Sequence, residues 1–227
     1  MLGLPDPSSQ FIVCKLLNGY NRQRPGKDTR LPITPSILKS ALANLPTVCT
    51  NKYESGLFAS AYTIAFFGFF RVGELTVTKG NSIDNIISIN DIAIEKESLI
   101  ITLRYSKTNQ LGDHERIGIK RSQDQICPIR FLIRYLRMRP KFGGPLFCHF
   151  DGSPVTRYQF TSVLKKALSN AGFNYTRFSS HSFRIGAATT AALNGIPADQ
   201  IQKAGRWRSQ AVRSYIRPSL VSVPDLI

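Results

Sequence analysis

Two residues that can bind and act on phosphate stand close together in the segment SHSFRIGAATT, at positions 180–190. His181 and Arg184 are three residues apart, so on a helix they share one face. If Ser180 caps that helix, both fall in its first turn, where free N–H groups and the helix dipole favour an anion. An imidazole, a guanidinium fork and a helix N-terminus together make a phosphate site. The alternative is a capped helix with a surface arginine and a half-buried histidine.

Three further polar residues follow apolar segments. Arg71 comes directly after the apolar run 57–70, and Glu74, three residues on, could hold its guanidinium in a fixed pose. An arginine there is otherwise the solvated end of a buried helix. Lys107 follows a predicted strand, where a hairpin tip could carry it over a ligand, although most hairpin lysines are simply solvated.

The segment AGRWRSQAVRSYIR at 204–217 contains Trp207, the only tryptophan, and Tyr215. A tyrosine hydroxyl can be a nucleophile when a base takes its proton. A tyrosine on an amphipathic helix more often serves packing. Each of these candidates is weak alone, and only their combination favours an enzyme site.

The elements that must position them predict an α+β fold, mostly helical with one small sheet. Partly alternating, β-branched segments predict a three-stranded antiparallel sheet from strands at 86–94, 99–105 and 116–120. Thr34 and Pro35 predict a helix start. Further helices are predicted at 57–70, 127–140, 156–172, 179–195, 197–205 and 209–218. Residues 1–25, with a possible helix at 8–22, are interpreted as the end of a preceding domain plus linker, and 26–227 as the main domain.

Composition limits the partners. The chain has 30 Lys and Arg against 14 Asp and Glu, a formal net charge of +16, which favours a polyanion such as nucleic acid. The four cysteines, Cys14, Cys49, Cys127 and Cys148, show no disulfide or zinc-site spacing, so we expect a reducing compartment and neither metal nor cofactor. The run 57–70 is too short to cross a bilayer, and no signal peptide is recognised. The expected location is the nucleus in a eukaryote, or the cytoplasm otherwise.

Four of these motifs, in this order, resemble those of the tyrosine recombinases, or phage-type integrases, over roughly residues 30–218. GFFRVGEL is similar to the family's first-arginine motif, SKT to its hairpin lysine, SHSFR to its H-x-x-R, and AGRWRSQAVRSYIR to its final box. The tripeptide GRW in this box is also similar to the corresponding motif of recombinases from eukaryotic mobile elements. The 23–34 segment resembles the linker from the family's N-terminal DNA-clamping domain.

The resemblance implies DNA strand cleavage and rejoining, in site-specific recombination or integration, through a 3′-phosphotyrosyl intermediate on Tyr215. It implies phosphate binding by Arg71 and Arg184, a proton acceptor in His181 and a general acid in Lys107. It also implies duplex DNA as substrate, self-association on DNA, and no membrane or small-molecule partner.

The final box departs from the family pattern, in which His or Trp follows the glycine. Arg206 has the family spacing to Tyr215, whereas Trp207 has the family chemistry. We expect Arg206 to face the phosphate and Trp207 to pack beneath the last helix, and both remain candidate site residues.

Other interpretations remain. A type IB topoisomerase would share the chemistry. A catalytically inactive, domesticated DNA-binding module would share the fold, although the presence of every candidate catalytic residue favours activity. An RNA-binding protein lacks the paired stacking motifs of the known modules.

Overall fold

The computed structural model describes residues 11–13, 15–16, 28–78, 80, 82–104 and 114–221. Residues 31–227 form one compact unit and residues 1–30 a separate one. Of the helix predicted at 8–22, the described residues 11–13 and 15–16 are helical. The assignment of residues 1–25 to the end of a preceding domain stays a prediction.

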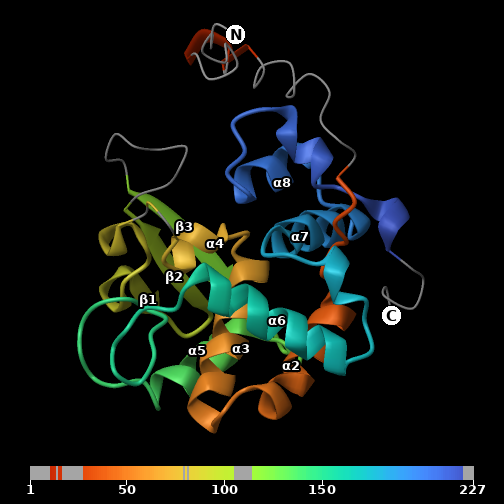
Figure 1. The fold of residues 1–227 in the computed structure, drawn as a ribbon. Helices are drawn as coiled ribbons and strands as arrows, with labels where there is room; N and C mark the ends of the chain where they lie inside the picture. Colours follow the sequence, from red (N-terminus) through yellow and green to blue (C-terminus); the bar gives the residue numbers. More distant parts are fainter. Residues whose placement is uncertain are drawn as a thin grey trace, which may run out of the picture. The chain divides into compact units, whose positions relative to one another are not determined.

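The central element is α3 (Lys52–Phe67), the apolar run of the sequence. It begins at Asn51, whose side chain accepts a hydrogen bond from the backbone N–H of Glu54 at 2.9 Å. All ten residues from Leu57 to Phe66 are buried, because α2, α5 and α7 all contact this helix. Figure 1 shows these helices gathered around α3, which therefore forms the axis of the core.

Capping residues explain where the helices around α3 begin. The predicted start at Thr34 and Pro35 is confirmed, since Thr34 Oγ1 accepts from the Ile37 N–H at the start of α2. Ser180 occupies the N-cap position of the helix that begins at His181, as predicted, but its side chain makes no capping hydrogen bond. The Ser179 hydroxyl instead accepts from the His181 N–H at 3.3 Å. The other helices of the described chain are α2 (Pro35–Val48), α4 (Val72–Leu75), α5 (Pro128–Leu136), α6 (Arg157–Asn170), α7 (His181–Leu193) and α8 (Ala198–Ala204).

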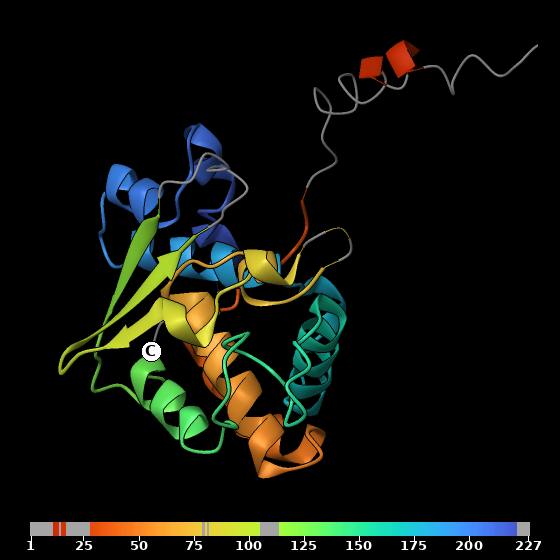
Figure 2. The same ribbon diagram turned by 90° about the vertical axis from the view of Figure 1, so that its left-hand side faces the viewer.

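The sheet confirms the predicted fold class. Strands β1 (Ile92–Ile94), β2 (Ser98–Leu103) and β3 (Glu115–Lys120) pair antiparallel in that order, with Ile101 opposite both Ile92 and Ile117. Figure 2 shows the three strands side by side against the helices. Alternate residues of β2, such as Leu99, Ile101 and Leu103, are buried in the core.

Two predicted elements differ from the structure. Of the strand predicted at 86–94, only the last three residues form a strand of the sheet. Before them, a 3₁₀ turn at Ile89–Asp91 is held by the side chains of Ser88 and Asp91, which accept hydrogen bonds from the backbone. The helix predicted at 209–218 is a 3₁₀ turn, Gln210–Ser214, and Tyr215 lies directly after it. Further 3₁₀ turns occupy Ile83–Asn85, Tyr175–Arg177 and Pro218–Leu220. None of the helices in the described part of the chain combines the length and hydropathy needed to span a bilayer.

Candidate active site

The turn that ends α3 supplies main-chain acceptors to the site. Gly68 follows the helix, and Phe69 has a φ of +51°, in the left-handed region that few residues other than glycine occupy. The carbonyl of Phe69 accepts from both Arg184 and Arg206, and that of Gly68 accepts from Arg206. Two guanidinium groups, distant in sequence, therefore meet at the carbonyl end of one helix, where the dipole favours cations.

Arg71 and Glu74 behave as their spacing predicts. The Arg71 backbone N–H and Nη1 donate to the Glu74 carboxylate at 2.8 and 3.0 Å. Glu74 is buried, with 5% of its side chain exposed, whereas Arg71 keeps 24% exposed. The carboxylate thus fixes the guanidinium while leaving part of it open to a ligand.

Arg184 is among the largest fully buried side chains of the described chain, with 2% exposure. It donates through Nη1 to the Phe69 carbonyl and through Nη2 to the Gly205 carbonyl at 2.7 Å. Burial, followed by repulsion from the Arg71 and Arg206 guanidinium groups, lowers its pKa to about 10. Arg184 therefore remains charged at neutral pH, and these arginines lie close enough to repel one another.

Arg184, Trp207 and Tyr215 contact one another. The Arg184 guanidinium carbon is 4.4 Å from the centroid of the Trp207 ring and 5.6 Å from that of Tyr215. The two aromatic centroids are 4.9 Å apart. A Cβ at Gly205 would lie 1.6 Å from the indole, so this position needs glycine for the ring to fit. The candidate nucleophile and a candidate phosphate-binding arginine thus share one cluster.

Arg206 lies against the turn after α3, and its expected contact with a phosphate stays a prediction. Its side chain is buried, and its terminal nitrogens donate to the Gly68 and Phe69 carbonyls and to Glu74. Spacing along the sequence does not reveal these acceptors. Trp207 packs with Val212 and Tyr215.

The two remaining candidates are less defined. His181 is the first residue of α7 and is half-buried, one turn before Arg184. Lys107 lies outside the described residues, between β2 and β3. Its role at the site stays a prediction.

Some donors in this cluster are buried and have no hydrogen-bond partner among the described residues. They are Arg184 Nε, Arg206 Nε and Trp207 Nε1. Buried donors in folded proteins are nearly always paired, so such atoms favour a site for an anionic acceptor. Arg206 Nε already faces the Glu115 carboxylate at 3.8 Å, whereas an acceptor can reach the other two atoms only after neighbouring side chains move.

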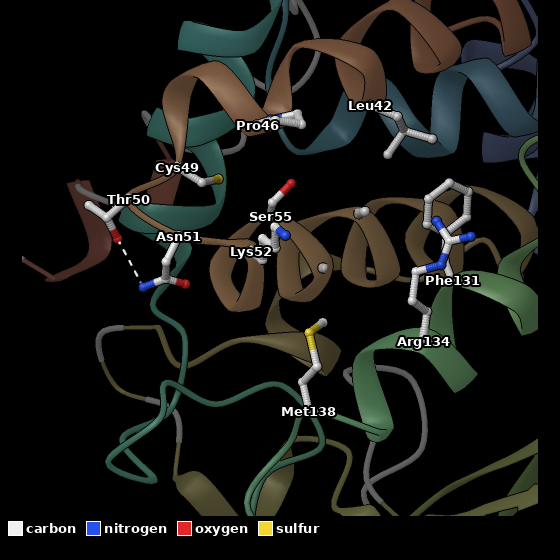
Figure 3. Close-up of a pocket in the computed structure, with 12 residues that line it drawn as sticks. Leu42, Pro46, Cys49, Thr50, Asn51, Lys52, Ser55, Phe131, Arg134 and Met138 are labelled. Carbon is white, nitrogen blue, oxygen red and sulfur yellow. Dashed lines mark hydrogen bonds between the residues drawn. The ribbon is translucent and has the colours of Figure 1, made fainter.

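A cavity of about 630 Å³ lies elsewhere, between α2, α3 and α5 (Figure 3). Leu42 and Pro46 line one side of it, and Phe131, Arg134 and Met138 the other. None of Arg71, Arg184 and Arg206 lines this cavity, so its size does not identify the candidate active site.

Sequence reasoning missed the main-chain carbonyl of Phe69 and the carboxylate of Glu115. Glu115 Oε2 lies 3.8 Å from Arg206 Nε. No sequence signal marks a carbonyl as an arginine acceptor. The position of Glu115 beside the predicted hairpin was visible, but its partner is 91 residues away and could not be inferred.

Comparisons with known proteins show which sequences this chain is similar to. Residues 70–219 match the model of the phage integrase family. The chain is 31% identical over 228 aligned residues to an integrase/recombinase xerD homolog of Selenomonas ruminantium. That alignment covers 94% of this chain and 62% of the relative, so the chain spans less than two thirds of that protein.

Solved structures share the fold. The XerH site-specific recombinase, in a post-cleavage complex with palindromic difH substrate, is similar with a TM-score of 0.62 and 18% identity, over 83% of this chain and 49% of that one. The XerA recombinase is similar with a TM-score of 0.63 and 15% identity, over 98% and 74%.

Proposed function

The chain belongs to the phage integrase family, and from that premise we propose that it cleaves and rejoins duplex DNA through a covalent 3′-phosphotyrosyl intermediate. The observation that carries the proposal is the cluster in which Arg184 lies over the Tyr215 ring and Arg71 is close enough to lower the pKa of Arg184. A nucleophile beside convergent guanidinium groups suits attack on a phosphodiester.

The proposed reaction exchanges one phosphate ester for another. The Tyr215 oxygen attacks the phosphorus, its proton passes to His181, and the bond from phosphorus to the 5′ oxygen breaks. The leaving 5′ oxygen takes a proton from Lys107. The ester energy is retained in the phosphotyrosine, so a 5′ hydroxyl of another strand can reverse the step and complete the exchange.

The arginines would stabilise charge that grows during this reaction. Negative charge increases on the non-bridging oxygens as phosphorus becomes five-coordinate, and we propose that Arg71 and Arg184 stabilise it. A donor aimed at developing charge contributes on the order of 3 kcal/mol. Because the Arg71 side chain is partly exposed and Arg184 is buried, we propose that Arg71 contacts the DNA first. Arg184 would then bind the phosphate after the Trp207 and Tyr215 side chains move.

Recombination requires more than one cut strand, so we propose that several copies act together on DNA. The XerH complex named above contains DNA substrate, which supports DNA as the substrate here. A DNA-acting protein of this kind would work in the nucleus of a eukaryotic host or in the cytoplasm of a prokaryotic one.

A suicide duplex, nicked so that the cleaved end diffuses away, tests the proposal. Wild-type protein should form a covalent adduct visible on denaturing gels. Tyr215→Phe should form none while its DNA affinity stays nearly unchanged, since only a hydroxyl is lost. Tyr158→Phe is the matched control, because Tyr158 is 79% exposed and lies outside the cluster.

Two outcomes would contradict the proposal. Adduct formation by Tyr215→Phe would place the nucleophile on another residue. Salt-dependent DNA binding by wild-type protein without any adduct would identify an inactive DNA-binding module instead.

A further inference from the structure

We infer that Arg206 is a positioning residue, which holds Arg71 and the turn after α3 in the reactive arrangement, and that it does not itself contact the phosphate. The inference rests on the proposed function, and it assigns to Arg206 a role opposite to the one expected from its spacing to Tyr215.

The terminal nitrogens of Arg206 are already occupied. Nη1 donates to the Gly68 carbonyl at 3.1 Å, and Nη2 donates to the Phe69 carbonyl at 3.2 Å and to Glu74 Oε2 at 2.9 Å. Only 4% of the side chain is exposed. A phosphate would have to displace the Gly68 carbonyl, which would be left without its donor, and the ion pair with Glu74. Arg184 is also buried and donates to two carbonyls, but it has no carboxylate partner and lies over the Tyr215 ring, so of the two arginines Arg206 is the less favourable phosphate contact.

Arg206 reaches Arg71 by two routes. Glu74 accepts from Arg206 through Oε2 and from Arg71 Nη1 through Oε1, at 2.9 and 3.0 Å, so one carboxylate joins the two guanidinium groups. The Arg206 carbonyl also lies 3.5 Å from Arg71 Nη2. Without the Arg206 guanidinium, Glu74 would keep only its bonds from Arg71, and the carbonyl of residue 206 would lose the side-chain contacts that fix its position. We therefore expect the Arg71 guanidinium to shift.

The backbone at Arg206 has a φ of +57°, in the left-handed region. A side chain other than glycine pays about 1 kcal/mol or more to stay there, so surrounding contacts must maintain it. This conformation lets one residue present its carbonyl to Arg71 while its side chain enters the turn after α3.

The same guanidinium touches the parts of the chain that carry the other candidate residues. The Phe69 carbonyl is shared with Arg184. Arg206 Nε lies 3.8 Å from Oε2 of Glu115, the first residue of β3. Arg206 therefore links three regions of the proposed active site while leaving their phosphate-facing groups in place.

A double-mutant cycle tests whether Arg206 acts through Arg71. Single-turnover cleavage of the suicide duplex is measured for Arg206→Met, Arg71→Met and the double variant, at a temperature where far-UV circular dichroism shows all of them folded. A displacement of about 1 Å at a reacting centre costs about 100-fold in rate. Arg206→Met should therefore slow wild-type cleavage about 100-fold, with DNA affinity within a few-fold, yet add little in the Arg71→Met background. Arg206→Lys should lie between Arg206→Met and wild type.

Arg139→Met is the matched control for a structural role. Arg139 is also buried, 6% exposed, and donates to the carbonyls of Leu146, Phe142 and Pro145, away from the cluster. It should lower the melting temperature without changing the cleavage rate of folded protein.

Three results would overturn the inference, and they are distinguishable. Wild-type protein that forms no adduct would refute the proposed function, and the inference with it. If wild type cleaves but adding Arg206→Met to the Arg71→Met variant slows cleavage as much as it does in wild type, Arg206 acts independently of Arg71. If Arg206→Met cleaves at the wild-type rate once folded, its role is structural only, as for Arg139.

Discussion

Replacing Trp207 by alanine should both destabilise the protein and displace the candidate nucleophile. Trp207 is 8% exposed and touches Arg184, Tyr215 and Phe69, with the Phe69 ring in an edge contact at 6.1 Å between centroids. Removing a buried indole costs about 3–5 kcal/mol when the cavity does not collapse. In a domain of this size each kcal/mol shifts the melting temperature by about 2–4 °C, so a fall on the order of 10 °C is expected.

The assay is urea unfolding followed by far-UV circular dichroism, because Trp207 is the only tryptophan and the variant has no indole fluorescence. Trp207→Phe is the matched control. It keeps an aromatic face against Arg184 and should lose less than half as much stability. Adduct formation by folded Trp207→Ala should also fall, since Tyr215 loses the ring against which it packs. A loss below about 1 kcal/mol, or unchanged cleavage, would refute this account of the cluster.

Three further predictions follow from other features. Gly186→Ala should cost about 3 kcal/mol in a denaturation assay, because its Cβ would lie 1.8 Å from a main-chain oxygen, whereas Gly118→Ala, with its nearest atom at 3.7 Å, should cost nothing. Charge reversal of the exposed Arg134 and Arg137 should flatten the slope of log K against log salt for DNA binding by about 2, and an unchanged slope would move the DNA footprint elsewhere. The pKa of Arg184 is lowered to about 10 in the fold, so the unfolded chain keeps that proton to higher pH and the free energy of unfolding should rise as pH increases above about 10. Arg184→Met should remove that rise, and an identical pH dependence in both proteins would contradict it.

Local signals in the sequence predicted most of the fold. Thr34 and Pro35 located the start of α2, and β-branched alternation located β2 and β3, because capping and side-chain alternation act over a few residues. The 3₁₀ turn before Tyr215 was not predicted, since its amphipathic pattern also fits a helix and only packing against Trp207 and α7 selects between them.

The candidate residues were also visible in the sequence, but not their orientations. The spacing of Arg206 to Tyr215 gives its position along the chain and says nothing about the acceptors around it. Those acceptors belong to Gly68 and Phe69, and the left-handed backbone of Phe69 has no sequence signature, because phenylalanine rarely adopts it. Contacts between such distant segments are decided by the tertiary fold.

The two arginines that donate to the turn after α3 also make the completion of the site a late step in folding. The carbonyls of Gly68 and Phe69 receive their partners from Arg184 and Arg206, 115 to 138 residues later in the chain. On the ribosome, α3 and its neighbours can begin to form while those acceptors still bind water. The turn and both arginines can be fixed only after residue 206 has left the exit tunnel. In a nascent chain that ends before residue 206 these carbonyls lack their Arg206 partner, so we expect the proposed strand cleavage to arise only after that residue has joined the fold.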